Sequence, residues 1–375
     1  MHLSQLSLTH FKNYSQANFR FSPNLNILFG KNGAGKTNVL DAIYYLSITK
    51  SYFNSVDNQQ ILQGDSYFVV EGIVNRAQLE ETTRLVFQKG QGKTLMVNNN
   101  PVEKFSAHIG SLPLVMIAPG DIQLIYEGSE ARRKFFDLII SQCNAMYLHE
   151  LMQYQRTLDQ RNKLLKDFFE NRYFNRELLE VYNTQLSISG TYLHRERLKF
   201  LQVFRPMFLE NYMKIAAGAE SVDLIYESDL NKHLFDHLLR DTESADIDLL
   251  RTTRGIHKDD LVFMLDNNLL KKFGSQGQQK SFIIALKLAQ FQYLEQMKGS
   301  KPILLLDDIF EKLDQSRLLE LFKWVSEGVF GQIFITDTQH ERSDELVKAA
   351  GLPASFFEIV NGEVLPFETN PSLRK

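Results

Sequence analysis

Residues 1–120 alternate between short apolar runs and turn-forming residues, which is the pattern of β-strands. Strands are predicted at residues 3–8, 17–21, 25–29, 67–74, 83–88, 94–97 and 114–118. Between residues 38 and 46 the apolar side chains instead recur at helical spacing. The amino-terminal region is therefore predicted to be rich in strands, with one helix directly after the third strand.

The middle of the chain changes to long, charged, helix-patterned segments at residues 147–170 and 176–212. Strand patterns return at residues 222–227, near 260, at 303–306 and 332–336, and in a hairpin with arms 356–360 and 363–366. Asn361-Gly362 joins these arms, and this dipeptide between two apolar runs is a strong hairpin signal. The pattern predicts an α/β domain, residues 1–128 and 250–375, split by a mostly helical inserted lobe, residues 129–249.

The composition narrows the possible functions. The chain of 375 residues has 43% hydrophobic residues and a net charge of −3, so it is expected to fold, and its overall charge does not indicate a nucleic-acid binder. Its single cysteine, Cys143, excludes an intramolecular disulfide and a cysteine-based zinc site. Apolar runs such as residues 113–119 are too short to cross a bilayer, and the amino terminus lacks the pattern of a secretory signal. A soluble, cytoplasmic protein with no membrane partner is expected.

Residues 30–37 match the phosphate-loop pattern G-x-x-x-x-G-K-[ST], and the loop follows a predicted strand and opens a predicted helix. Its glycines let backbone amides wrap a phosphate chain, and the helix amino terminus favours an anion. Lys36 is expected to pair with the β- and γ-phosphates, and the Thr37 hydroxyl to bind Mg²⁺. The predicted nucleotide contacts in the loop are Gly30, Lys31, Asn32, Gly33, Ala34, Gly35, Lys36 and Thr37.

A second candidate segment is the apolar strand 303–306, which ends in two carboxylates, Asp307 and Asp308. Asp307 is the expected second partner of Mg²⁺. Asp308 stands where a general base polarises the attacking water. Lys36, Asp307 and Asp308 are therefore the predicted catalytic residues.

A third segment, residues 274–280, places small and polar residues directly before a helix. Ser275 and Gly277 offer hydroxyl and amide donors to an anion, although such a segment taken alone is an ordinary helix cap. A bound phosphate chain needs only one such set of donors from its own subunit. The second set therefore suggests donation to a nucleotide that a partner molecule holds.

With these segments in place, the chain resembles the RecF family of bacterial recombination-mediator ATPases, in the SMC-type branch of the ATP-binding-cassette (ABC) superfamily. The resemblance rests on Phe11-Lys12-Asn13-Tyr14 and on residues 127–137, 160–165, 257–261, 275–280 and 304–314, which occur in the family's order. It implies a P-loop ABC-type ATPase head, with a mixed sheet and helices, that sandwiches ATP between two subunits arranged head to tail.

The resemblance also implies roles for particular residues. Lys12 and Asn13 would line the nucleotide, and the signature residues Ser275, Gly277 and Gln278 would reach the γ-phosphate of the other subunit. The loop at Leu313-Asp314 would couple the two sites.

The chain departs from the family's pattern at one turn, where it has Gly255-Ile256-His257 and the family usually has Gly-Pro-His. Residues 336–338 also contain no switch histidine, the residue that a transport-type cassette would place there. RecF proteins often lack that histidine, so the sensor of the γ-phosphate stays unassigned. The glutamine-loop residue is also open, and its candidates are Gln59, Gln60 and Gln123.

Clusters of basic residues in the inserted lobe bear on DNA binding. Such runs are usually solvated helix faces, and acidic residues are interspersed among them here. The resemblance implies DNA binding, and lysine and arginine on this lobe would bind phosphates without reading bases. The candidate DNA contacts are Arg132, Arg133, Lys134, Arg161 and Lys163.

The resemblance implies an ATP-driven homodimer that clamps DNA, single-stranded and duplex, at gap junctions. Weak, DNA-stimulated ATP hydrolysis would release the clamp. The role would lie in DNA replication, recombination, the SOS response and the repair of DNA damage, with RecO and RecR as partners in loading the recombinase.

Alternative functions differ in their sequence requirements. An SMC-like structural head needs long coiled-coil arms, and residues 129–249 lack sustained heptads. A transporter-type ABC subunit needs a Leu-Ser-Gly-Gly signature and a switch histidine, and the chain lacks both. A module that binds ATP without hydrolysing it stays open.

Overall fold

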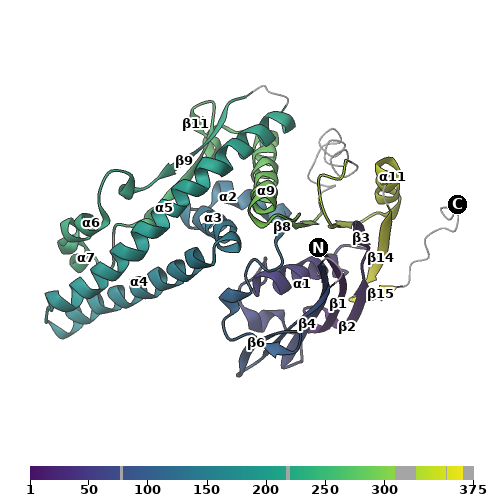
Figure 1. Cartoon of the computed structure of the whole chain (residues 1–375), viewed down its shortest axis with the longest axis horizontal. Helices are drawn as coiled ribbons and strands as arrows, with labels where there is room; N and C mark the ends of the chain where they lie inside the picture. The colour runs from purple at the N-terminus through teal and green to yellow at the C-terminus, as the bar shows by residue number, and fades with distance from the viewer. Residues whose placement is uncertain (77–78, 217–219, 309–326, 352, 366–375) are drawn as a thin grey trace. The chain divides into compact units, whose positions relative to one another are not determined.

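The computed structural model describes residues 1–76, 79–216, 220–308, 327–351 and 353–365, and the chain forms two compact units (Figure 1). The first unit combines Met1–Asp121 with Gln290–Lys375, and the second comprises Ile122–Ala289. Both ends of the chain therefore contribute to one unit. The predicted coupling loop at Leu313-Asp314 lies outside the described residues.

The first unit contains two six-stranded sheets. One is antiparallel throughout, in the order β2-β1-β4-β5-β6-β7. Its strands are β1 (His2–Phe11), β2 (Tyr14–Arg20), β4 (Tyr67–Arg76), β5 (Leu79–Gln88), β6 (Gly92–Val97) and β7 (Asn100–Pro101). Along β5 the buried positions Thr83, Leu85 and Phe87 alternate with more exposed ones, which is typical of a sheet with one face in the core.

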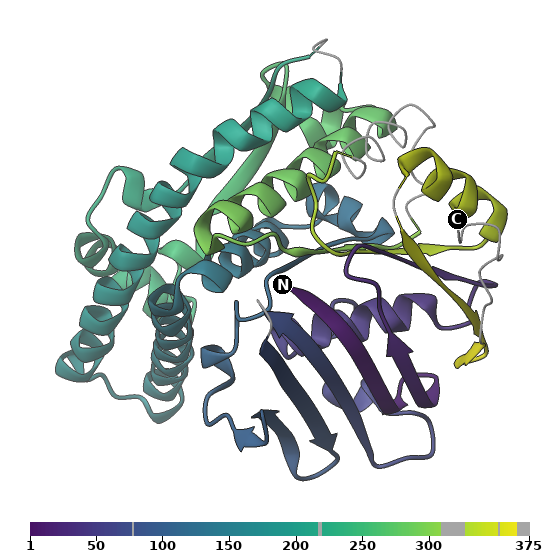
Figure 2. The same cartoon turned by 45° about the vertical axis from the view of Figure 1, so that its right-hand side comes forward.

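The second sheet has the order β15-β14-β3-β13-β12-β8, and all its strands except β15 run parallel (Figure 2). Its strands are β3 (Leu25–Phe29), β8 (Leu114–Ile117), β12 (Ile303–Leu306), β13 (Ile333–Asp337), β14 (Ala354–Val360) and β15 (Glu363–Leu365). The four adjacent strands β3, β13, β12 and β8 are buried at every position, as expected of a parallel sheet covered on both faces. The mixed sheet predicted from the sequence is therefore present.

Helix α1 (Lys36–Ile48) contacts strands of both sheets, among them β4 and β5 of the first and β8 and β13 of the second. Nearly all of its residues are buried, which explains why its sequence is apolar on most sides. It begins seven residues after β3 ends, so the phosphate loop lies at the carboxyl end of a parallel strand. Ligands of open α/β sheets bind at that end.

The second unit is built mainly from two long helices that lie side by side, α4 and α5 (Figures 1 and 2). The helices that lie in this unit or begin in it are α2 (Gln123–Tyr126), α3 (Ser129–Cys143), α4 (Ala145–Asn171), α5 (Arg176–Ile215), α6 (Phe235–Asp241), α7 (Glu243–Asp248), α8 (Leu270–Phe273) and α9 (Gln276–Lys298). The segments 147–170 and 176–212 predicted as helices are confirmed as α4 and α5. The first unit adds α11 (His340–Ala350).

The second unit also contains a small antiparallel sheet, in the order β11-β10-β9. Its strands are β9 (Val222–Glu227), β10 (Asp260–Leu265) and β11 (Asn268–Leu269). The ring of Phe282 in α9 lies 4.6 Å from the ring of Phe208 in α5 and 4.9 Å from that of Phe263 in β10. This shared core joins residues 250–289 to the inserted helices, whereas the sequence-based division assigned them to the α/β domain. The second unit is therefore longer than the predicted lobe 129–249.

The carboxyl-terminal hairpin is confirmed, with β14 and β15 paired around Asn361-Gly362. Asn361 has φ 48° and Gly362 has φ 80°. Two positive φ angles at the central positions are the signature of a type I′ turn, which matches the twist of the paired strands. Among the described residues, no helix is long and apolar enough to cross a membrane.

Candidate nucleotide-binding site

The loop between β3 and α1 depends on glycine at two positions. Gly30 has φ 149°, and a Cβ on it would lie 2.3 Å from the carbonyl oxygen of Ile359 in β14. Gly35 has φ 119°, and its Cβ would lie 2.6 Å from the Asn13 side chain. A side chain at either position would push the loop away from its supports, so these glycines fix the path of the loop as well as leaving room for phosphate.

Lys36, the first residue of α1, folds back over this loop. Its Nζ donates to the carbonyl oxygens of Gly30 at 2.7 Å and Lys31 at 3.0 Å. The side chains of Lys31 and Asn32 are exposed. The ammonium group is therefore held against the backbone of the loop, in the position expected of a lysine that pairs with the phosphates of a nucleotide.

Asp307 and Thr37 meet at the carboxyl end of the parallel sheet. The Thr37 hydroxyl donates to Asp307 Oδ1 at 2.8 Å, and the Thr336 hydroxyl donates to the same oxygen at 2.9 Å. Burial raises the pKa of Asp307, and the nearby Asp308 raises it further, while the two threonine hydrogen bonds oppose the shift. A divalent cation would relieve this cost of burying a carboxylate, so Asp307 and Thr37 form a donor pair suited to Mg²⁺.

Asp308 follows directly and has a left-handed backbone, with φ 45°. Its amide donates to the Thr336 hydroxyl at 2.8 Å. Thr336 therefore touches both carboxylate residues, one through its hydrogen and one through its oxygen. The sequence shows that residues 336–338 lack a histidine, but no local pattern signals this contact of Thr336 with the aspartate pair.

The loop is supported from both ends of the chain. Asn13 Nδ2 donates to the carbonyl oxygen of Ala34 at 2.9 Å, and the Gly362 amide donates to the same oxygen at 2.9 Å. The Tyr14 hydroxyl donates to the carbonyl oxygen of Gly35 at 3.0 Å. The sequence predicted the Asn-Gly turn but not its contact with the loop, because a turn signal carries no information about distant partners.

Lys12, the other residue that the resemblance placed at the nucleotide, has a left-handed backbone with φ 54°. Its Nζ lies 2.5 Å from Oδ2 of Asp41, a fully buried carboxylate of α1. It therefore links the turn between β1 and β2 to α1. The Lys12 amide also donates to the carbonyl oxygen of Gln60 at 2.7 Å.

The three glutamine-loop candidates and His340, the histidine that follows residues 336–338, have the following contacts or positions. The amide side chain of Gln60 is buried and donates to the carbonyl oxygens of Asn54 and Val56, and Gln59 accepts from Asn54. Gln123 begins α2 in the second unit. The His340 ring packs against the rings of Phe29 and Phe356, at 4.9 Å and 5.0 Å.

The signature segment lies in the second unit, at the amino terminus of α9. Ser275 Oγ accepts from the Gln278 amide at 3.3 Å, and Gln278 Oε1 accepts from the Ser275 amide at 2.6 Å. These reciprocal bonds are a capping box, in which the first residue of the turn and the one three places later cap each other. The Ser275 side chain is exposed, so its hydroxyl hydrogen faces solvent or a ligand.

The structure changes the list of candidate DNA contacts. Arg161 is fully buried and donates to Asp246 and Thr252, both at 2.8 Å, so its prediction as a DNA contact is wrong. Arg132 donates to both oxygens of Asp260, each at 2.8 Å. Its guanidinium group thus joins α3 to β10 inside the second unit.

Arg133 is likewise engaged, with hydrogen bonds to Ser129 Oγ at 2.7 Å and to the carbonyl oxygen of Asp259 at 2.6 Å. Lys134 is 76% exposed and pairs with Glu130. Lys163 is exposed on α4. The two lysines are therefore the members of the original list that stand at the surface.

The phosphate loop, the carboxylate pair after a parallel strand and the inserted unit define a class, the ABC-type ATPase head of SMC-like proteins. The sequence profile described as RecF/RecN/SMC N terminal domain matches residues 2–354. A solved SMC head bound to the C-winged helix domain of ScpA superposes with a TM-score of 0.57 at 15% identity, covering 100% of both chains. That likeness shows the fold.

More specific relatives then identify the family. The chain is 47% identical over 363 residues to the protein named DNA replication and repair protein RecF of Flavobacterium johnsoniae, covering 96% of this chain and 100% of that one. It is 44% identical over 368 residues to the protein of the same name from Parabacteroides distasonis, covering 98% and 100%. A solved structure described as the recombination mediator RecF-ATP in the RecFOR pathway superposes with a TM-score of 0.89 at 28% identity over 98% of each chain. The chain belongs to the RecF family.

Proposed function

We propose that this protein is an ATP-dependent DNA-binding ATPase in DNA replication and recombinational repair. ATP bound in the first unit closes a head-to-tail homodimer on DNA, and slow hydrolysis opens it. The observation that carries this proposal is the pairing of a pre-formed phosphate loop with a buried carboxylate, where Thr37 donates to Asp307 at 2.8 Å. The name of the RecF relatives and the ATP complex of one of them support it.

ATP binding falls to the residues of the first unit. The amides of residues 30–37 and the Lys36 ammonium group surround the phosphates, while Asn13 keeps the loop in shape through Ala34. Bound Mg²⁺ would neutralise charge on the β- and γ-phosphates, and Thr37 and Asp307 would hold it. Lys12 is proposed to act beside the loop, through its ion pair with Asp41.

Hydrolysis is assigned to Asp308, whose carboxylate accepts a proton from the attacking water. Thr336 is well placed to assist, because it bonds to both Asp307 and the Asp308 amide. Thr336 thereby links the Asp307 carboxylate to the backbone of Asp308, the residue proposed as the base.

The second subunit is proposed to complete the site with Ser275, Gly277 and Gln278. The capping box holds this turn, and the helix amino terminus offers amides and a favourable dipole to an anion. Two residues before Ser275, the ring of Phe273 is 67% exposed. This ring therefore stands at the surface beside the turn that the second nucleotide is proposed to meet.

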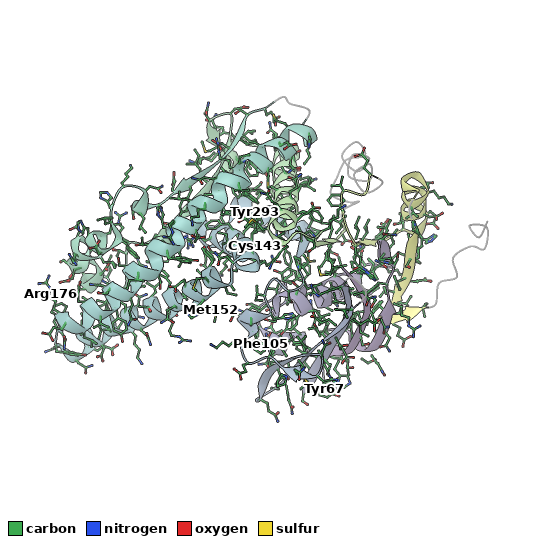
Figure 3. All side chains as sticks on the ribbon, viewed as in Figure 1. Tyr67, Phe105, Cys143, Met152, Arg176 and Tyr293 are labelled. Carbon is green, nitrogen blue, oxygen red and sulfur yellow. The ribbon has the colours of Figure 1, made fainter. Side chains whose placement is uncertain are left out.

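DNA binding is assigned to phosphate contacts from the second unit, with Lys134 and Lys163 as candidates. Lys163 lines the same surface pocket of α4 as Met152, which is labelled in Figure 3. Such contacts are sequence-blind and weaken as salt rises. RecO and RecR are the proposed partners, consistent with the RecFOR pathway named for the solved relative, and the proposed location is the cytoplasm.

The proposal is tested by analytical ultracentrifugation of the protein with ADP, ATP and a slowly hydrolysed ATP analogue, each with and without DNA. ATP and its analogue should give dimers, and ADP should give monomers. DNA should sediment with the dimer alone. Phosphate release measured on the same samples identifies a module that binds ATP without hydrolysing it, because that module would dimerise and release no phosphate.

A further inference from the structure

Glu220 connects the signature turn to the core of the second unit. Its Oε1 accepts a hydrogen bond from Gln278 Nε2 at 2.8 Å, and its Oε2 accepts one from the Tyr212 hydroxyl at 2.6 Å. Both partners donate to one carboxylate, which can only accept. Glu220 therefore bridges the end of α5 and the first turn of α9.

The Tyr212 end of this bridge is fixed. Tyr212 is fully buried, and its ring lies 6.1 Å from Phe282 and 6.3 Å from Phe208. Close packing leaves such a ring little freedom, so the position of its hydroxyl is set by the core. The hydroxyl in turn sets the position of the Glu220 carboxylate.

The Gln278 end of the bridge determines the orientation of the signature. An amide side chain presents a donor on one side and an acceptor on the other. Since the Glu220 carboxylate accepts only, the NH₂ side of Gln278 must face Glu220, and the carbonyl oxygen must face the Ser275 amide. The backbone N–H of Gln278 donates to Ser275 Oγ, so the serine hydroxyl hydrogen is available to a further acceptor.

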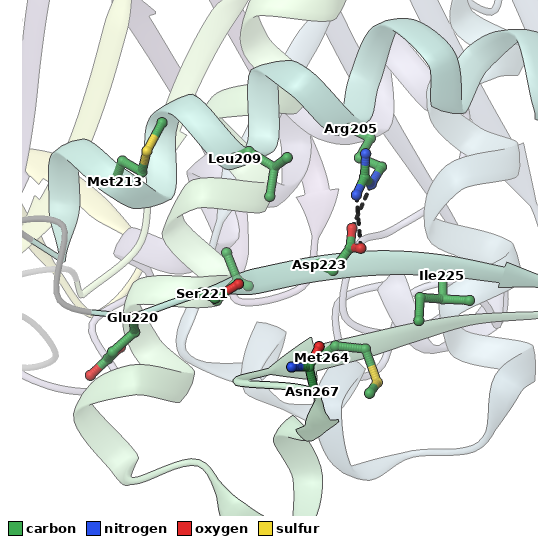
Figure 4. Close-up of a pocket in the computed structure, with 10 residues that line it drawn as sticks. Arg205, Leu209, Met213, Glu220, Ser221, Asp223, Ile225, Met264 and Asn267 are labelled. Carbon is green, nitrogen blue, oxygen red and sulfur yellow. Dashed lines mark hydrogen bonds and ion pairs between the residues drawn. The ribbon is translucent and has the colours of Figure 1, made fainter.

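Glu220 also lies at one end of a pocket of about 350 Å³ between α5 and β9, lined by apolar side chains that include Leu209, Met213 and Ile225 (Figure 4). At another point of the same pocket, Arg205 pairs with Asp223 and joins the same two elements. Glu220, which precedes β9, and Asp223, which lies in β9, thus both bind side chains of α5. Glu220 also binds Gln278 of the signature, and Asp223 does not.

We propose that Glu220 is a positioning residue for the ATP site that two subunits share, a proposal that rests on the proposed function. It fixes the Gln278 amide, and with it the capping box, in the orientation that directs the Ser275 hydroxyl to the γ-phosphate of a nucleotide held by a second copy of this chain. Glu220 itself does not touch the nucleotide. It acts through Gln278.

The test measures ATP-dependent dimerisation of the full chain by sedimentation, together with ATP binding by the monomer. Glu220→Ala should weaken ATP-dependent dimerisation about tenfold, in the range of a hydrogen bond to a charged group, and leave the monomer's affinity for ATP within about twofold of wild type. Glu220→Gln retains an acceptor for Gln278 and should recover most of the loss. Asp223→Ala is the matched control, because it removes a carboxylate that ties β9 to α5 without touching α9.

A double-mutant cycle with Gln278→Ala separates positioning from a general structural effect. If Glu220 acts through Gln278, the double variant should dimerise no worse than Gln278→Ala alone. Amide exchange of the peptide covering residues 274–280 in the ATP-free protein should also speed up in Glu220→Ala and not in Asp223→Ala. A merely structural role would lower the melting temperature of both variants alike and leave that local exchange rate unmoved.

Three outcomes overturn the inference. The inference is contradicted if the Glu220→Ala variant dimerises with ATP as the wild type does. It is also contradicted if the losses of dimerisation free energy from Glu220→Ala and Gln278→Ala are fully additive. A loss shared equally by Asp223→Ala would assign the effect to the joint between α5 and β9. Wild-type protein that stays monomeric with ATP would instead refute the proposed function itself, so the two failures are distinguishable.

Discussion

The phosphate loop of the first unit is supported on several sides by its own chain, whereas the signature turn of the second unit is anchored from behind and faces solvent. Ala34 in the loop accepts from Asn13 and from Gly362, residues near opposite ends of the sequence. Ser275 in the signature is exposed, and its supports, Gln278 and Glu220, come from the second unit alone. The two turns proposed to bind phosphate, each at the amino terminus of a helix, are thus supported in different ways.

This difference in support suggests that the loop and the signature turn have different roles. A loop held from both ends of the chain is ready to bind a nucleotide without a partner, since little ordering remains to be done on binding. A turn held from one side keeps an open face for a group that arrives from outside. We infer that the first unit determines whether ATP binds, and that the second determines whether the bound ATP brings two subunits together.

The largest expected effect comes from removing the cation of the loop. Lys36→Ala should weaken ATP binding by at least about 100-fold, because the loss of a charge-assisted contact to phosphate is a loss of about 3 kcal/mol. Titration calorimetry measures it directly. Lys89→Ala, which removes an exposed lysine of the same unit, is the control and should bind like wild type. Tight binding by Lys36→Ala would show that the loop is not the nucleotide site.

The next effect separates binding from turnover. Asp308→Asn keeps the shape of the side chain but removes its basicity, so the hydrolysis rate should fall by about two orders of magnitude while ATP binding persists. Dimers should accumulate with ATP and outlast those of the wild type in sedimentation runs. Unchanged phosphate release would assign the orientation of the water to another group, with Thr336 as the first candidate.

A smaller effect tests the support of the loop from the carboxyl-terminal hairpin. An added Cβ on Gly362 would lie 2.2 Å from the carbonyl oxygen of Asn13, so Gly362→Ala should displace the loop and weaken ATP binding about tenfold. Gly90→Ala is a matched control, because Gly90 has φ 81° against 80° for Gly362 and no atom within 4 Å of its added Cβ. Equal losses of ATP affinity in the two variants would attribute the effect to backbone strain.

The smallest effect concerns pH. Burial raises the pKa of Asp307 above its ordinary 3.8, so the ionised form is disfavoured in the folded protein. Below its ordinary pKa, Asp307 is protonated in both the folded and the unfolded protein, and its burial then costs no ionisation energy. As the pH rises through the raised pKa of the folded state, the buried carboxylate ionises and the free energy of unfolding falls. Nucleotide-free Asp307→Asn should therefore melt about 1–2 °C above wild type near neutral pH, and the gap should close in acid. A wild type that melts higher at neutral pH would show that Asp307 is stabilised as an anion.

Much of the fold follows from local pattern. The hairpin around Asn361 and the helices α4 and α5 were predictable, because turn chemistry and helical period are encoded within a few residues. The boundary of the second unit was not, because it depends on Phe263 and Phe282 joining a core with the distant Phe208. Packing between remote segments leaves no periodic signal.

The same division applies to the sites. The motif predicts the loop and the carboxylate pair, but the roles of Thr336, Gly362 and Glu220 depend on contacts across the fold. The error at Arg161 was avoidable, since it shares one helical face with Tyr154, Leu158, Leu165 and Phe168, all buried. A cation on an apolar stripe is more often a buried, paired residue than a ligand contact.

The central claim is that each ATP site is shared between two subunits, and mixing two defective variants tests it most directly. Ser275→Arg places a bulky cation in the open turn and should abolish dimerisation while the monomer still binds ATP. Lys36→Ala spoils the other half of the site. A mixture of the two can form one intact composite site per dimer, so we predict partial recovery of ATP hydrolysis that neither variant shows alone. If Ser275→Arg instead prevents the isolated monomer from binding ATP, the turn serves its own subunit's nucleotide, and the shared site is contradicted.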